Sequence, residues 1–451
     1  MLAEDTLQKS VHFTSLGCSK NLVDAQVMLG VLNNHGYTVH QDPETAQVMV
    51  VNTCAFIDEA KAESIKTILD LGAIKKEGQT LVVSGCLAQR YSGELESEMP
   101  EVDLFIGTGE YQNIHQYLEA KKEGQLNKKS FVEIPKYIHT EFDPRLNTSP
   151  SYMAWLKVSE GCNRKCTFCI IPKLRGSLRS RTKESLVTEA KNLVGQGVKE
   201  LNVISQDLSS YGVDLNEENS LLELLKALDG VEDLKWLRLF YYYPDELTDE
   251  IIDFMAQSKK ICSYLDMPVQ HFSDTVLKRM NRKITGQEIH GRIERLRERI
   301  PDIVIRTSVI VGFPGETEED FNTLLEGVKE AKFDHLGVFK YSDEEGTPAY
   351  RLGEKLDQAT IDERFEKIYE AQKEIADQKT KSQVGKTLEV MVEGLHEETE
   401  FLFKARHYGQ APDIDGVVLI NDTKDQALHA GDFVKVKITD QYAYDLVGEI
   451  V

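Results

Sequence analysis

The sequence lacks any uninterrupted apolar run of about 18 residues, the length that a membrane-spanning helix needs. Its first nine residues are polar and acidic, without the charged-then-apolar pattern of an export signal. Basic residues are also few, because 53 Lys and Arg stand against 75 Asp and Glu, for a formal charge of −22. We therefore expect a cytoplasmic protein without membrane contact that favours basic proteins over nucleic acid, although a local basic patch is compatible with this balance.

Cysteine is scarce, with seven residues in 451. An odd number in a chain without an export signal does not indicate a disulfide framework. Six of the seven fall into two groups whose placement is typical of metal ligands. The seventh, Cys262, lies in an apolar run, and we expect it to be a packing residue, like the tyrosines 241–243.

The length predicts several domains, and the pattern changes three times along the chain. Residues 1–125 alternate β-rich runs (11–16, 48–51, 81–83, 104–106) with amphipathic helices, which predicts a parallel-sheet α/β domain. Lysines and prolines then predict a linker at 126–150. Residues 151–383 hold six strand–helix repeats and predict a partial (β/α)6 barrel, whereas 384–451 predict a small five-stranded β-barrel. The fold class is α/β multidomain.

The strongest motif is a run of three cysteines, Cys162-x3-Cys166-x2-Cys169, directly after a predicted strand. Three thiolates so close in sequence can hold one cubane iron–sulfur cluster, and they leave one iron without a protein ligand. A zinc site that lacks its fourth ligand and three unrelated buried thiols are the alternatives. We favour the cluster because an open iron can bind a reaction partner.

The other group is spread over the first domain. Cys18, Cys54 and Cys86 are 36 and 32 residues apart, and each lies between a predicted strand and a predicted helix. Parallel strands end at the same edge of a sheet, so these three loops should converge there. Each cysteine alone reads as a small buried hydrophobe, but three at equivalent positions predict a second three-cysteine cluster.

The Cys162 motif after the first strand of a partial barrel resembles the radical S-adenosylmethionine superfamily. The resemblance implies that the open iron is chelated by the cofactor, whose reductive cleavage yields a 5′-deoxyadenosyl radical. It also implies cofactor contacts at strand ends, although ordinary turn chemistry is the alternative at each of them. The implied contacts are Phe168, Gln206, Asp207, Gln270, Arg306 and Ile310.

Two clusters in this order resemble the methylthiotransferase family over essentially the whole chain. The resemblance implies two [4Fe-4S] clusters, a sulfur held at the N-terminal one, and S-adenosylmethionine as the source of both the methyl group and the radical. It further implies a flavodoxin or ferredoxin as electron donor. A non-enzymatic iron–sulfur electron carrier is the alternative of another class, but such carriers normally complete each cluster with four cysteines.

The segment from Gly17 to Asp24 resembles the branch of the family that modifies an aspartate β-carbon in small-subunit ribosomal protein number twelve. The branch that modifies adenosine in transfer RNA more often reads Gly-Cys-Gln-Met-Asn there. Ala25 and Gln26 depart from the expected Ser-Glu, which we interpret as surface variation. The segment from Ile170 to Gly176 also resembles the ribosomal-protein branch.

The last domain resembles the TRAM module, which binds RNA in the transfer-RNA enzymes. Here it contains 6 Lys and Arg against 13 Asp and Glu, a charge of −7. That sign suits a basic ribosomal protein better than RNA, with scattered surface acidity as the alternative. Nucleic acid is then not required, although the substrate allows association with the ribosome. The transfer-RNA reaction is the alternative function.

Two further features of the sequence do not add to the functional assignment. The basic residues around the second cysteine group are either a solvated face or an attraction for anions, and the pattern favours neither. They are Arg164, Lys165, Lys173, Arg175, Arg179, Arg181 and Lys183. His271 has no second ligand at metal-binding spacing, so we assign it no metal role.

Overall fold

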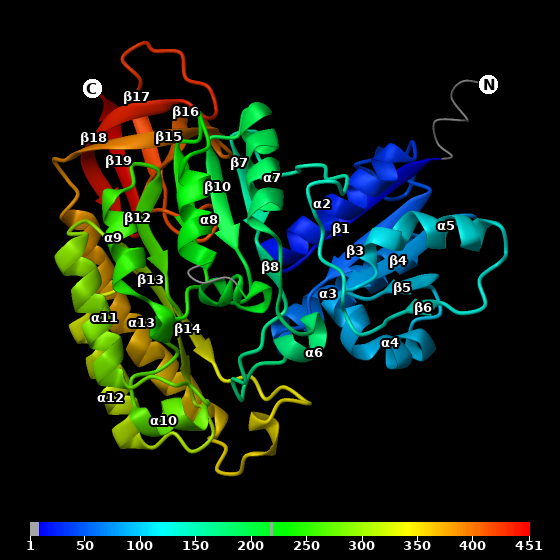
Figure 1. The fold of residues 1–451 in the computed structure, drawn as a ribbon, viewed down its shortest axis with the longest axis horizontal. Helices are drawn as coiled ribbons and strands as arrows, with labels where there is room; N and C mark the ends of the chain where they lie inside the picture. The colour runs from blue at the N-terminus through cyan, green and yellow to red at the C-terminus, as the bar shows by residue number, and fades with distance from the viewer. Residues whose placement is uncertain (1–8, 217–219) are drawn as a thin grey trace.

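The computed structural model describes residues 9–216 and 220–451, so all but the last residue of the acidic N-terminus lies outside the described part. Three units follow one another along the chain, as Figure 1 shows: an α/β unit, a larger strand–helix unit and a C-terminal barrel. The predicted α/β multidomain fold is confirmed. None of the helices in the described ranges combines the length and the hydropathy of a membrane-spanning segment.

The N-terminal unit is a six-stranded parallel sheet in the order β2-β1-β3-β4-β5-β6. Its strands are β1 (Ser10–Ser15), β2 (Thr38–Val39), β3 (Val48–Thr53), β4 (Thr80–Gly85), β5 (Leu104–Ile106) and β6 (Ser130–Phe131). Its helices are α2 (Ser19–Asn34), α3 (Asp58–Ile74), α4 (Cys86–Glu98) and α5 (Ile114–Lys122). Strand β6 falls within the stretch 126–150 that we predicted to be a linker.

Helices cover both faces of this sheet, which explains the continuous apolar run in β3. Val48 and Val50 pack with residues of α2 and α5, whereas Met49 and Val51 pack with residues of α3 and α4. Side chains alternate between the faces of a strand, so both sets are buried. The sheet thus brings the ends of β1, β3 and β4 next to one another.

The central unit is a second six-stranded parallel sheet, in the order β14-β13-β12-β11-β10-β7. The strands are β7 (Met153–Lys157), β10 (Glu200–Ile204), β11 (Trp236–Leu239), β12 (Ile261–Asp266), β13 (Val304–Val311) and β14 (His335–Lys340); the short β8 (Ser159–Glu160) and β9 (Arg179–Ser180) pair separately. The helices are α6 (Ile171–Arg175), α7 (Lys183–Gly195), α8 (Ser220–Asp229), α9 (Asp249–Gln257), α10 (Asp274–Arg279), α11 (Gly286–Arg299), α12 (Glu318–Ala331) and α13 (Gln358–Lys381).

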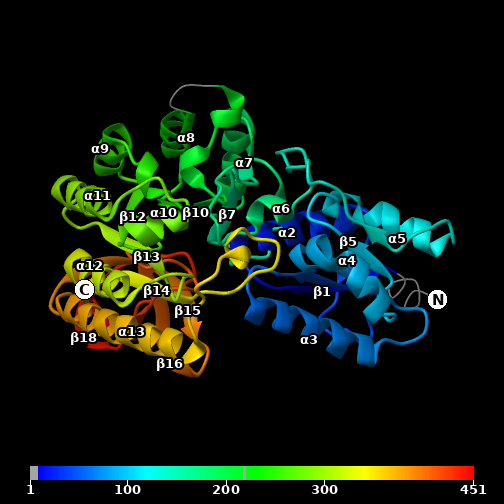
Figure 2. The ribbon, with the colours of Figure 1, turned by 90° about the horizontal axis from the view of Figure 1, so that it is seen from below.

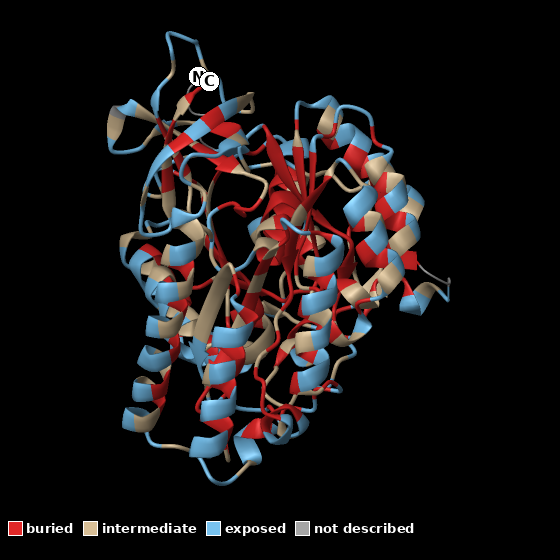
Figure 3. Cartoon of the chain, turned by 90° about the vertical axis from the view of Figure 1, so that its left-hand side faces the viewer, coloured by how far each residue is buried: buried red, intermediate tan, exposed pale blue. Residues whose placement is uncertain are grey.

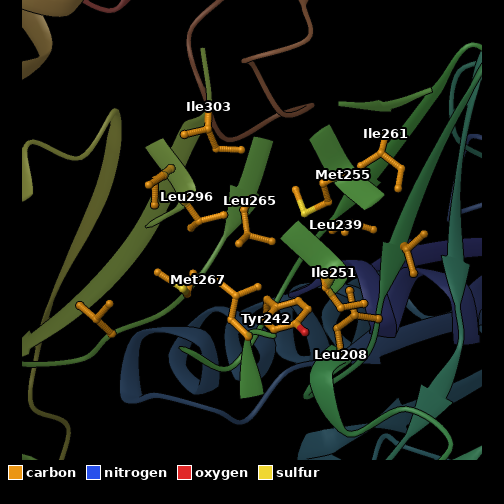
Figure 4. Packing of buried hydrophobic residues seen from close by; sticks show 14 of the residues in the cluster. Leu208, Leu239, Tyr242, Ile251, Met255, Ile261, Leu265, Met267, Leu296 and Ile303 are labelled. Atoms are coloured by element: carbon orange, nitrogen blue, oxygen red, sulfur yellow. The ribbon is translucent and has the colours of Figure 1, made fainter. Parts of the chain in front are cut away.

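Helices α7, α8, α9, α11, α12 and α13 line the outside of the central sheet (Figure 2). Their inward apolar residues and the outer face of the strands form the main core, part of which Figure 4 shows around Leu239, Leu265 and Tyr242. Figure 3 shows the buried strands in the centre and exposed helix surfaces outside. The inner face of the strands is also buried, because Trp155, Trp236 and Tyr264 pack in a cluster that includes Val23 of α2 and Met391 of the C-terminal unit.

The C-terminal unit is a closed barrel in the order β15-β16-β17-β19-β18. Its strands are β15 (Thr387–His396), β16 (Thr399–His407), β17 (Val418–Asp422), β18 (Phe433–Tyr442) and β19 (Asp445–Ile450). It packs on the amino-terminal ends of the central strands. There Arg406 is ion-paired with Glu200 at 2.7 Å, the ring centroids of Trp236 and Phe433 are 5.0 Å apart, and His335 Nε2 is 3.0 Å from a main-chain oxygen of residue 409.

Candidate functional site

The three N-terminal cysteines lie together at the carboxyl edge of the first sheet. Cys18 is the N-cap residue of α2, Cys54 directly follows β3, and Cys86 is the first residue of α4. Gly17 has a φ of +86°, and a Cβ there would lie 2.7 Å from the Cβ of Cys54. The loop that carries Cys18 therefore touches Cys54, and only glycine fits this approach.

A side chain from the central unit reaches this group. Arg175, the last residue of α6, lies with its Nη2 3.4 Å from the Sγ of Cys86 and donates to the Oδ1 of Asn21 at 3.0 Å. Asn21 in turn donates to the main-chain oxygen of Leu16 at 2.7 Å, which holds the Cys18 loop. Burial raises the pKa of the Cys86 thiol to about 12, an effect that Arg175 opposes. For Arg175, the interpretation of the basic run as a solvated face is wrong, since this side chain is buried.

Buried ion pairs join the two units around Arg175. Lys157, at the end of β7, lies 2.6 Å from Glu160 and is also paired with Asp24 of α2. Gln206 donates its Nε2 to the Oε1 of Glu160 at 2.5 Å. Burial raises the pKa of Glu160, but Lys157 and Arg175 overcome this effect and lower the pKa to about 2. The first cysteine group and the end of β10 thus share one charged network.

The second cysteine group lies in the loop after β8. The main-chain N–H of Arg164 donates to the Sγ of Cys162 at 3.4 Å, and the Arg164 Nε donates to Asp207 at 2.8 Å. Asp207 also accepts from the hydroxyls of Ser209 and Ser210, at 2.5 and 2.6 Å. The carboxylate of Asp207 therefore positions the cysteine loop through Arg164.

The cysteines of this group are coupled as well. Burial and, to a smaller extent, the charges of Cys166 and Cys162 together raise the pKa of Cys169 to about 12. The pKa of Cys162 is raised to about 11, again first by burial. Because a coordinated thiol is a thiolate, iron binding here must release protons.

The other residues that we predicted as cofactor contacts have well-defined neighbours in the structure. Phe168 and Ile310 belong to one apolar cluster that also includes Phe313 and Ala349. Gln270 has a φ of +73° and bridges to β13 through its backbone. The guanidinium of Arg306 is 3.0 Å from Asp266 and 3.7 Å from Asp415 of the C-terminal unit, so this side chain is held by two carboxylates.

Two tyrosines that we expected to be packing residues lie at the site instead. The Oη of Tyr243 is 3.6 Å from the Sγ of Cys166, and Lys20 lies with its Nζ 3.2 Å from the ring centroid of Tyr241. Tyr242 is a core residue, as expected, and Cys262 is buried in an apolar cluster. The signal that could have found the two tyrosines is their position, since they follow a strand at the same edge as the cysteines.

The interpretation of Ala25 and Gln26 as surface variation is also wrong. Both are buried, because α2 packs against the segment 144–149. Gln26 donates its Nε2 to Thr148 Oγ1 at 3.2 Å, and its Oε1 accepts from Arg145 Nε at 2.9 Å. This pair of residues belongs to the contact between the first two units.

The polar side chains of the site fit a bound polar group. In the described part of the chain, the Oε1 of Gln206 and the hydroxyls of Ser205 and Ser159 are buried without a hydrogen-bond partner. Buried polar atoms normally have partners, so these three atoms suit a ligand such as S-adenosylmethionine. Within the same ranges, no three His, Cys, Asp or Glu side chains gather around a single ion position. Each thiolate of a cubane cluster binds a different iron, which requires wider spacing.

Family comparisons agree with this division of the chain. Residues 156–328 match the Radical SAM superfamily, residues 10–107 match uncharacterized protein family UPF0004, and residues 384–451 match the TRAM domain. The fold and the cysteine loop thus define a radical S-adenosylmethionine protein, and this superfamily match implies an iron–sulfur cluster and S-adenosylmethionine as cofactors.

Curated relatives narrow the family. A protein of Bdellovibrio bacteriovorus described as ribosomal protein uS12 methylthiotransferase RimO is 50% identical over 100% of this chain and 99% of its own length. Proteins of the same description from Myxococcus xanthus and Clostridioides difficile are 51% and 46% identical, over 99% and 98% of this chain and 93% and 98% of their own lengths. The chain belongs to the RimO family of ribosomal protein uS12 methylthiotransferases.

Solved structures support the fold alone. The radical S-adenosylmethionine methyltransferase TsrM from Kitasatospora setae has a TM-score of 0.56 at 14% identity, over 76% of this chain and 74% of its own. The cobalamin-dependent S-adenosylmethionine radical enzyme OxsB has a TM-score of 0.53 at 13% identity, over 84% and 57%.

Proposed function

We propose that this chain inserts a methylthio group at the β-carbon of an aspartate in ribosomal protein uS12, using S-adenosylmethionine and two [4Fe-4S] clusters. The proposal depends on one observation. Three thiols lie together at the carboxyl edge of the first sheet, three more lie together in the loop after β8, and Arg175 reaches from the central unit to the first group. Full-length relatives with that printed function support the substrate.

The protein's own residues have separate tasks. Cys162, Cys166 and Cys169 would hold one cluster, and Cys18, Cys54 and Cys86 the other. When bound, the cofactors supply a carbon-centred radical that removes hydrogen from an unactivated carbon, and a sulfur that this carbon receives. Phe168, Gln206, Asp207, Gln270, Arg306 and Ile310 would contact or position S-adenosylmethionine.

These last six residues differ in how directly they would act. Gln206 offers a buried acceptor without a partner in the described ranges, and Phe168 with Ile310 offers an apolar surface for an adenine ring. Asp207 acts through Arg164 on the cysteine loop, and Arg306 is engaged with Asp266. We therefore assign direct contact to Gln206, Phe168 and Ile310. We assign positioning to Asp207 and Arg306, and also to Gln270, which bridges to β13 through its backbone.

The charge of the last unit supports a basic protein substrate. Its −7 would repel the phosphates of RNA and attract a ribosomal protein. The reaction would then take place in the cytoplasm, where ribosomes are made, with a flavodoxin or ferredoxin as electron donor. Nucleic acid would not be required, although association with the ribosome is compatible with the substrate.

Anaerobic reconstitution with iron counting tests the two clusters. We expect two four-iron clusters in the wild type, and we expect Cys54→Ala and Cys166→Ala each to lose a different one. Zinc at both positions with no iron uptake would contradict the proposal. Mass spectrometry of uS12 and of transfer-RNA nucleosides from a deletion strain tests the substrate. Loss of methylthio-adenosine with uS12 unchanged would favour the transfer-RNA reaction instead.

A further inference from the structure

Lys20 is a buried cation without a carboxylate partner in the described part of the chain. Its side chain belongs to the first turn of α2, two residues after Cys18, and the residue is 7% exposed. Its Nζ lies 3.2 Å from the ring centroid of Tyr241. Within residues 9–216 and 220–451 no carboxylate lies at ion-pair distance from this ammonium; Tyr241 and the Cys18 thiol act on it electrostatically, and Asp266 does so more weakly.

Two other cations of the site are different, because each has its carboxylate. Lys157 lies 2.6 Å from Glu160, and Arg164 lies 2.8 Å from Asp207. Asp266 is itself occupied, since Arg306 and the main-chain N–H of Tyr241 bind it at 3.0 and 3.1 Å. The ammonium of Lys20 thus has no carboxylate of its own, and a buried cation in this position can still pair with an incoming carboxylate.

The surroundings of Lys20 favour an anion too. The first turn of α2 has no acidic residue and no side-chain cap, and its amino end is the positive end of the helix dipole. The hydroxyl of Ser19 is buried and has no hydrogen-bond partner in the described part of the chain. These groups favour a carboxylate ligand, which the described part of the chain does not itself provide.

Lys20 also lies between the two cysteine groups. It follows Cys18 of the first group, and its neighbour Tyr241 is two residues before Tyr243, whose Oη is 3.6 Å from the Sγ of Cys166. A substrate carbon that is to meet chemistry from both groups must pass through this region. An anion held by Lys20 would therefore be part of the substrate.

We propose that Lys20 binds the side-chain carboxylate of the target aspartate and thereby selects an acidic side chain over a neutral one. The inference rests on the proposed function, because it takes uS12 as the substrate. An ammonium–carboxylate hydrogen bond in a buried site is among the stronger polar contacts. A neutral amide would leave the charge of Lys20 unpaired. The ring of Tyr241 holds the ammonium in place but does not neutralise it.

The test compares recombinant uS12 that has its target aspartate with uS12 that has asparagine there. Binding to the reconstituted full chain is measured by anaerobic fluorescence anisotropy. For the wild type we expect the aspartate form to bind about tenfold to a hundredfold more tightly. Lys20→Met should bind both forms equally, at the level of the wild type with asparagine. Lys20→Arg should keep the preference, because it keeps the charge.

Matched measurements separate this role from a structural one. Lys66→Met removes a charge from an exposed lysine of α3 and should keep the wild-type preference. Iron content, electron paramagnetic resonance spectra and S-adenosylmethionine binding by equilibrium dialysis should be the same in Lys20→Met as in the wild type. Retained preference for aspartate in Lys20→Met would overturn the inference, and so would loss of iron or of S-adenosylmethionine binding. Wild-type protein that neither binds nor modifies uS12 would instead overturn the proposed function itself, and the inference with it.

Discussion

The Nη2 of Arg175 lies 3.4 Å from the Sγ of Cys86, although the two residues belong to different sheet units. Arg175 follows Cys169 by six residues, so the segment that carries the second cysteine group also supplies a cation to the first. The first cysteine group thus takes part of its environment from the central unit. The joint between the two units is therefore part of the site.

Replacing Arg175 by methionine should change the N-terminal cluster more than the other one. Loss of the cation next to Cys86 removes a hydrogen bond to sulfur, which makes the cluster harder to reduce. We expect its midpoint potential to fall by on the order of tens of millivolts, measured by redox titration with electron paramagnetic resonance. Arg179→Met, in the same segment, is the control and should leave the potential unchanged. An equal shift in both variants would contradict a specific role for Arg175.

Substituting Gly17 by alanine should weaken the first cysteine group. The new Cβ would lie 2.7 Å from the Cβ of Cys54, and φ is +86°. Gly78→Ala is a matched control, because Gly78 has a φ of +88° and open space around it. Both variants should lose about 1 kcal/mol of folding free energy from the backbone, but only Gly17→Ala should lose N-terminal iron on reconstitution. Normal iron content in Gly17→Ala would show that the loop can move without harm.

The buried pair of Arg406 and Glu200 should hold the C-terminal barrel on the central sheet. Arg406→Met leaves Glu200 with only Arg238 at 2.9 Å, and it also removes the 2.6 Å pair with Glu393. Removing one member of a buried pair costs about 3–5 kcal/mol. We expect that loss in urea unfolding, together with faster proteolysis before residue 387. Lys404→Met removes a more exposed partner of Glu393 and should change stability by less than about 1 kcal/mol.

Stability should fall in mild acid because of His139. This side chain is buried, and its Nε2 is 3.0 Å from the Nη1 of Arg181, which requires a neutral imidazole. Burial lowers the pKa of His139 to about 4, below an unfolded value of about 6.5. The folded chain thus binds fewer protons than the unfolded chain, and its stability is complete above pH of about 6.5 and declines as the pH falls through about 4.

His139→Gln tests this prediction, because an amide oxygen can accept from Arg181 and does not titrate. We expect the wild type to lose about 3 kcal/mol more than this variant between pH 7 and pH 4, by urea unfolding at each pH. His429→Gln, on an exposed histidine, should leave the wild-type pH profile unchanged. Identical profiles for the wild type and His139→Gln would assign the acid sensitivity to other groups.

The sequence predicted the edges on which the site stands. Parallel strands have to end together, so the positions of Cys18, Cys54 and Cys86 were enough to predict their meeting. The strands 104–106 and 200–204 were predicted at their observed bounds, because each apolar run is short and bounded by polar or glycine residues. The bounds of these strands follow from the local sequence pattern and do not depend on contacts between units.

Contacts between units could not be predicted in the same way. Gln26 was interpreted as a surface residue because a polar side chain in a helix usually faces water, yet the segment 144–149 covers it. Arg175 and Lys20 have no sequence pattern that names their partners, since both contacts cross from one sheet unit to the other. Such pairs depend on how preformed surfaces dock, and periodicity within one element does not encode that.

The barrel covers the amino-terminal ends of the central strands, whereas the cysteines lie beyond their carboxyl ends. A strand of five or six residues spans about 17–20 Å, so one ligand must extend at least that far to touch both places. A short peptide that fills the cysteine-lined end leaves the barrel without any role in its capture. Under the proposed function, a substrate that contacts both ends must exceed this length, so its affinity should rise with its size.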